Sequence, residues 1–223
     1  MSITLQERLA NPTTPWMLAQ KLLSHELRVA MPATVQSFDA ETQTVVVQPA
    51  IREQMRNKQQ VVVPTTLPLI SYVPIVIPTA GGYALTLPIQ AGDEGLLVVA
   101  DNCIDAWWQS GGVQNQIDLR RHDLSDAFFI VGCYNQTRKI SSYSTSTVQI
   151  RTDVGDTVVE VGNGEITIKA ATVTVQAEQV NVTGSEKVTI SGNNQTVIDD
   201  VTFLQHTHSG VTAGGGVTGP VVP

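Results

Sequence analysis

Cysteine, clustered basic residues and long apolar runs are all scarce in this 223-residue sequence, and each absence excludes a class of protein. Cysteine occurs only at Cys103 and Cys133, which excludes a disulfide-rich secreted scaffold. We expect two free thiols, with one bridge as the alternative. The 13 basic residues form no cluster and are outnumbered by 20 acidic ones, which argues against binding to duplex nucleic acid. No apolar run approaches the roughly 20 residues of a membrane span, and no signal peptide is predicted.

Aromatic residues are also few, at 5% of the chain, and their distribution is uneven. Residues 144–202 contain no Phe, Tyr or Trp and are built from Val, Ile, Thr, Gly and small polar residues. Large side chains supply much of the buried area of an ordinary core, so a segment of this size without them is too thin for a free-standing domain. Its many β-branched residues are not typical of disorder either. The contacts that bury the apolar residues of 144–202 must therefore come from outside this segment.

The first 32 residues are predicted to form a helical segment. Thr14 is a suitable N-cap, Pro15 suits the first helical position, and Pro32 ends the pattern. Apolar residues recur at helical spacing between them, at Trp16, Ala19, Leu22, Leu23, Leu27 and Ala30. This pattern predicts an amphipathic helix that packs on its own domain or on a neighbour.

Residues 33–143 are predicted to form a β domain. Short runs of Val, Ile and Leu alternate with turn residues at 44–48, 61–63, 67–77, 84–89, 95–100 and 127–131. Several short strands separated by turns favour a small barrel or sandwich. Prolines interrupt the section from residue 64 to residue 88, where we expect an irregular or edge-rich excursion.

Residues 144–204 carry an internal repeat. Aliphatic residues recur in i, i+2 pairs that begin at residues 148, 159, 166, 173, 180 and 188. Such pairs lie on one face of a strand, and the spacing predicts strands of four or five residues joined by short turns. Turn residues stand between the pairs, as in 162–164 and 192–194.

A single chain cannot easily bury these pairs, because each strand offers only two aliphatic side chains. A meander of this kind would also keep an unpaired edge on each side. Several chains wound around a common axis would remove the edges and fill a narrow core that has no room for aromatic residues. We therefore predict an intertwined oligomer. A monomeric β-sandwich or an ordinary solenoid is the alternative.

The repeat is followed by His206 and His208, in a tip segment of residues 205–223. Two His at i, i+2 of an extended segment point to the same side. In a three-fold assembly they would bring six imidazole nitrogens to the axis, which favours an octahedral ion over the four-coordinate zinc of structural sites. Iron is the first choice of metal. The alternative is a pair of solvent-exposed His in a tail.

A catalytic interpretation is not favoured. His122, Asp123, Ser125 and Asp126 crowd into one turn, whereas hydrolytic triads are assembled from separated segments. The acids Asp93, Glu94, Asp101 and Asp105 are interpreted as solvated turn residues. We expect no enzymatic activity.

Four segments resemble a known family: GDEGLLVVAD (92–101), IDAWWQSGG (104–112), RHDLSDA (121–127) and IVG (130–132). They are similar to the N-terminal domain of the short membrane-piercing central spike proteins of contractile-tailed phages. The resemblance extends through the repeat to His206 and His208. It implies a mainly β chain with an N-terminal helix, an OB-fold barrel at 33–143, an intertwined triple-stranded β-helix of a homotrimer at 144–204, and a metal-bound tip.

The same resemblance implies a function. One iron ion per trimer would be held by six His, and calcium or chloride ions can lie along the axis of such spikes. The spike would sit at the tail tip of a virion, attached to hub proteins of the tail tube, and would contact the host outer membrane when the sheath contracts. It would be made in the host cytoplasm and would bind no nucleic acid.

Three other functions are alternatives to this one. A lytic spike enzyme would need an inserted catalytic domain, for which the chain has no room. A trimeric receptor-binding fibre would display binding residues along its flank, but the flank here is plain, with Thr167, Thr174, Asn181 and Thr189. A spike from a phage-derived bacteriocin or secretion particle cannot be separated from a phage spike by sequence.

Overall fold

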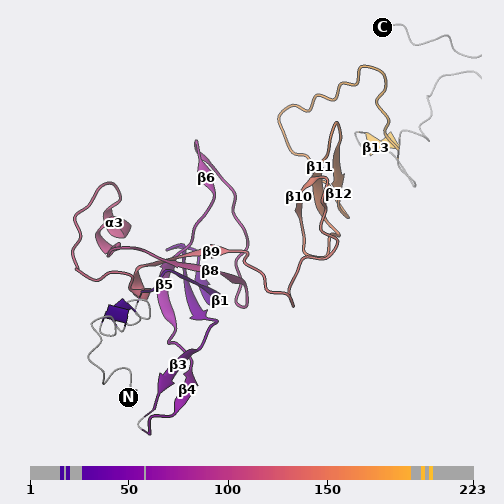
Figure 1. The fold of residues 1–223 in the computed structure, drawn as a ribbon. Coiled ribbons are helices and arrows are strands. Elements are labelled where there is room, and N and C mark those ends of the chain that lie inside the picture. Colours follow the sequence, from indigo (N-terminus) through magenta and orange to yellow (C-terminus); the bar gives the residue numbers. More distant parts are fainter. Residues whose placement is uncertain are drawn as a thin grey trace, which may run out of the picture.

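The computed structural model describes residues 16–17, 19–20, 27–57, 59–191, 197–198 and 201–202. In this part of the chain the fold is mainly β, as predicted (Figure 1). Trp16, Met17, Ala19 and Gln20 are helical, whereas residues 27–29 of the predicted N-terminal helical segment have no regular secondary structure; residues 1–15, 18 and 21–26 lie outside the described residues. None of the described helices has the length and apolar character required to span a bilayer.

A curled five-stranded sheet forms the centre of the N-terminal half (Figure 1). Its strands stand in the order β5-β2-β1-β8-β9 and all neighbours are antiparallel. The strands are β1 (Ala30–Asp39), β2 (Thr44–Pro49), β5 (Ile70–Pro74), β8 (Glu94–Val99) and β9 (Ala127–Val131). Its two edges meet in a parallel bridge between Ile75 and Phe129, and the amide of Val76 donates to the carbonyl of Phe129 at 2.9 Å. The sheet therefore curls into a partly open barrel, the kind of architecture that was predicted.

The core of this barrel follows from the alternation of its strands. In β8, Gly95, Leu97 and Val99 point inward while their neighbours are only half-buried. The buried core residues are Ala33, Val35, Val45, Val47, Ile70, Val73, Leu97, Val99, Ala127 and Phe129. A side chain at Gly95 would place its Cβ only 2.5 Å from Cζ of Phe129, so glycine here makes room for the largest core residue.

The sequence prediction was wrong at the start of the barrel. Strand β1 begins at Ala30, which the helical pattern had included, and Pro32 lies inside the strand rather than at a helix end. Pro32 already pairs with Leu96 of β8, but pairing of β1 with β2 starts only at Ala33, so the missing N–H of Pro32 removes no bond from the β1–β2 ladder. Leu27, Val29 and Met31 stand at i, i+2 spacing, a strand pattern that overlaps the end of the helical one.

Two hairpins project from the barrel. The first joins β3 (Glu53–Arg56) to β4 (Val62–Thr65), and the second joins β6 (Thr79–Ala80) to β7 (Tyr83–Ala84). The expected strand at 84–89 is wrong beyond Ala84, and the expected strand at 67–77 is shortened to β5. Prolines remove ladder donors throughout this section, which accounts for both differences.

The C-terminal half contains a three-stranded antiparallel sheet made of β10 (Val148–Arg151), β11 (Val158–Val161) and β12 (Ile166–Lys169). These strands coincide with the first three aliphatic pairs of the repeat. Residues 170–191, which carry the next three pairs, form no strand within the chain. A short ladder follows between β13 (Val197–Ile198) and β14 (Val201–Thr202).

Candidate functional site: an open aliphatic face and a charged network

One face of the β10–β12 sheet is entirely aliphatic. The ladders place Val148 opposite Val161, and Val161 opposite Ile166. In the second row, Ile150 pairs with Val159 and Val159 with Ile168. Directly paired residues share one side of a sheet, so these six side chains form a continuous surface. We call it the aliphatic face.

Nothing in the described part of the chain covers the aliphatic face. Val148 is 72% exposed, and even Val159 at its centre is 38% exposed. The aliphatic residues that follow are exposed as well, namely Val173, Val175, Val180, Val182, Val188 and Ile190. Soluble monomers rarely expose a contiguous apolar surface of this extent, and such surfaces mark interaction sites.

The opposite face of the same sheet carries mostly polar and charged residues. Gln149, Glu160 and Thr167 lie across from one another there, and the Thr147 hydroxyl donates to the Glu160 carboxylate. Arg151 fixes the base of the sheet by donating to the carbonyls of Ser142 at 2.9 Å and Asp153 at 3.1 Å. Apart from the buried Val158, the sheet is thus polar on one side and apolar on the other, as expected for an element with one side buried in an assembly.

The metal ligands predicted from sequence, His206 and His208, lie outside the described residues. The structure therefore leaves the predicted iron site as a prediction.

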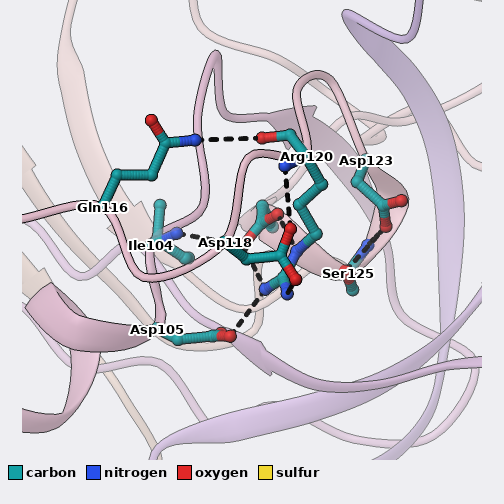
Figure 2. A network of polar contacts seen from close by, with 8 residues as sticks. Ile104, Asp105, Gln116, Asp118, Arg120, Asp123 and Ser125 are labelled. Carbon is teal, nitrogen blue, oxygen red and sulfur yellow. Dashed lines mark hydrogen bonds and ion pairs between the residues drawn. The ribbon is translucent and has the colours of Figure 1, made fainter.

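A second feature, a network of charges centred on Arg120, lies in the connection between β8 and β9 (Figure 2). This connection contains helix α3 (Asp105–Ser110) and the short 3-10 helix η1 (Leu124–Asp126). Asp126 is fully buried and accepts from Nε and Nη2 of Arg120, at 2.6 and 2.9 Å, and from the amide of Ile104 at 3.0 Å. Nη2 of Arg120 also donates to Asp105 at 2.6 Å, and Asp118 lies 3.5 Å from Nη1.

These contacts set the protonation of the network. The hydrogen bond from Arg120 lowers the pKa of Asp105, while the two carboxylates raise the pKa of Arg120. Because the folded pKa of Asp105 lies below its unfolded value of 3.8, its stabilising contribution is present above that pH and is lost as the pH falls through the folded pKa.

Cys103, Asp105 and Asp126 lie close enough together to hold a metal ion. However, Arg120 already donates short hydrogen bonds to both carboxylates. The arrangement is therefore a structural ion-pair network. The sequence interpretation of Asp105 as a solvated turn residue was incomplete, since only the fold reveals its partner.

The cluster at 122–126 is not a catalytic arrangement. Ser125 donates its hydroxyl and its amide to Asp123, at 2.6 and 2.9 Å, which lowers the pKa of Asp123 and caps η1. The His122 ring instead contacts two other residues: its Nε2 lies 3.0 Å from Asp101, and its Nδ1 lies 3.1 Å from the carbonyl of Arg28. His122 thus contacts neither of these two residues through its ring nitrogens.

Replacing Arg120 tests the structural role of the network. Arg120→Met leaves the buried Asp126 carboxylate without its charge partner, which should lower the free energy of unfolding of the barrel by about 3 kcal/mol. Urea unfolding followed by fluorescence of the neighbouring Trp107 and Trp108 measures the change. Arg121→Met is the matched control, because Arg121 is exposed and its nearest carboxylate is 3.8 Å away, so a change within about 0.5 kcal/mol is expected. Equal effects of the two substitutions would contradict this role.

The barrel is similar to a known phage protein domain. Residues 31–132 match the family model described as the N-terminal domain of phage protein Gp138. The match begins one residue into β1 and ends one residue after β9, so it coincides with the partly open barrel and covers a little under half of the chain. A search of curated proteins found no match. The family match supports a phage tail or baseplate protein with a structural role in the virion.

Proposed function

We propose that this chain is the cell-puncturing spike at the centre of a phage baseplate, which pierces the host outer membrane when the tail sheath contracts. The observation that carries the proposal is the aliphatic face of the β10–β12 sheet. In the sequence, this sheet follows the barrel that matches a phage protein domain. Within the chain, it leaves apolar side chains open to water.

Three copies of the chain would cover this surface. Three aliphatic faces turned toward a common axis would bury one another, and Val and Ile are small enough to fill the narrow core between them. The exposed pairs at 173–190 would continue the same core once strands from the other chains supply hydrogen-bond partners. The resulting homotrimeric rod would transmit the thrust of contraction to its tip, a mechanical role that requires no catalysis.

The tip would be held together by a metal. Three copies of His206 and His208 supply six imidazole nitrogens, a donor set that fits an octahedral first-row ion, and iron is the proposed one. Such an ion would supply a fixed point that joins three chain ends. Calcium or chloride ions on the axis are a further part of the proposal. The spike would be bound to hub proteins at the tail tip of the virion.

The mass of the protein in solution tests the proposed function. Size-exclusion chromatography with light scattering should give three times the 24.0 kDa of one chain. Because the chains would be wound around one another, the trimer should also resist SDS unless it is heated. A monomer at micromolar concentration would contradict the proposal.

A further inference from the structure

The connection between β8 and β9 lies at the end of the barrel opposite the linker to the β10–β12 sheet. Strand β9 begins at Ala127, which pairs with Val99 at the end of β8, so residues 100–126 cap this end. The same strand ends at Val131, where the linker toward β10 departs. A strand of five residues separates the two ends by roughly 17 Å. Helix α3 and strand β10 accordingly lie on opposite sides of the barrel (Figure 1).

Five large apolar side chains are exposed on this connection. Val113 is fully exposed and Leu119 is 89% exposed. Trp107, Trp108 and Ile117 are exposed as well, at 42% or more of their surface. We call these five residues the distal surface. Tryptophan is enriched among the residues that dominate protein–protein binding energy, so Trp107 and Trp108 are the part of this surface most typical of docking.

The fold holds much of the distal surface in place. The ring of Trp107 packs edge-on against Phe128 of β9, with the ring centroids 5.8 Å apart. Arg120, next to Leu119, is bound to Asp105 and Asp126, which ties the exposed loop back to α3 and to the start of β9. A surface that is already ordered loses less entropy when a partner binds.

The charge around the distal surface indicates the chemistry of the partner. Residues 101–126 contain five Asp and two Arg, with no Lys or Glu. Asp101 and Asp118 are 65% and 55% exposed; Arg121 lies 3.8 Å from Asp101 and Arg120 lies 3.5 Å from Asp118, so the acids are partly paired but still outnumber the cations. An acidic rim is repelled by an anionic membrane surface and by a second copy of itself, but it complements a protein whose apolar socket has a basic rim.

We propose that the distal surface docks the spike onto such a basic-rimmed apolar socket on the baseplate hub. This inference rests on the proposed function, under which the barrel end opposite the spike faces the tail tube. Val113 and Leu119 insert into the socket, and the Arg120 network holds their loop in the binding conformation.

Complementation of a phage that carries a nonsense mutation in this gene tests the assignment. The full-length chain is supplied from a plasmid during infection, and its copies per purified particle are measured by quantitative mass spectrometry. Val113→Asp and Leu119→Asp should each reduce incorporation at least about tenfold, because a carboxylate in an apolar socket loses its hydration. Tyr83→Asp is the matched control. Tyr83 is 84% exposed on the β6–β7 hairpin, which follows the end of β5 on the linker side of the barrel.

The outcomes separate this inference from the proposed function. The expected result is that both loop variants keep the mass of the wild-type protein but are missing from particles, while Tyr83→Asp is incorporated normally. Normal incorporation of the loop variants overturns the docking assignment and leaves the proposed function standing. A lower mass of the loop variants also overturns it, because the surface would then join copies of this chain. Failure of the wild-type chain to enter particles overturns both.

Discussion

The Val159→Lys variant should elute as a single 24.0 kDa chain in place of a trimer. Val159 lies on the middle strand of the aliphatic face, between Ile150 and Ile168. In the proposed assembly three copies of this side chain meet near the axis. Three ammonium groups cannot be buried together there, because each would lose its hydration and all would repel one another. Light scattering after size-exclusion chromatography measures the mass directly.

The matched control places the same residue on the other face of the sheet. Thr167 lies on β12 directly opposite Glu160 of β11, and its side chain is exposed. Thr167→Lys therefore puts the new charge beside a carboxylate on the polar side, and the protein should remain trimeric. Trimers of unchanged stability from Val159→Lys would show that the aliphatic face is not the assembly surface. Loss of the trimer in both variants would mean that any new charge on this sheet is disruptive.

The repeat could be predicted from sequence because its signal is local. An i, i+2 pair of aliphatic residues followed by a glycine-containing turn, as at Val159 and Val161 before 162–164, is enough to place a strand and its face. Which strands pair with one another could not be predicted in the same way. The first three pairs find each other within the chain, whereas the pairs from Val173 onward do not. The alternation within a pair places a strand and its face but does not specify which other strand it pairs with.

The barrel was predictable in its interior and less so at its borders. Strands β2, β8 and β9 stand within a residue of the apolar runs that predicted them. The start of β1 was missed because Ala30 also continues the helical spacing of the apolar residues before it. The Arg120 network was also missed, since Asp105 is fifteen residues from Arg120 in the chain and only the folded connection brings them together. The sequence of a turn-rich segment does not indicate which of its charged residues are buried in the fold.

Simultaneous replacement of His206 and His208 by Ala should remove the bound iron and leave the rod trimeric. The expected iron content falls from one ion per trimer to less than about 0.2, since a site without its imidazoles has no comparable donors to offer. Elemental analysis by mass spectrometry on protein purified without chelators measures it. The rod should keep its mass because the aliphatic face precedes these residues and does not depend on the ion.

His122→Ala is the matched control for the metal measurement. Its ring contacts Asp101 and the carbonyl of Arg28 on the barrel, so its loss removes an imidazole from the chain and leaves the proposed ligands intact. Iron retained by the double variant, or iron below about 0.2 per trimer in the unmodified protein, would contradict the proposed site. Loss of the trimer in the double variant would instead assign the metal a role in assembly. A tip that only gathers three chain ends can lose its ion while the buried aliphatic core keeps the chains together.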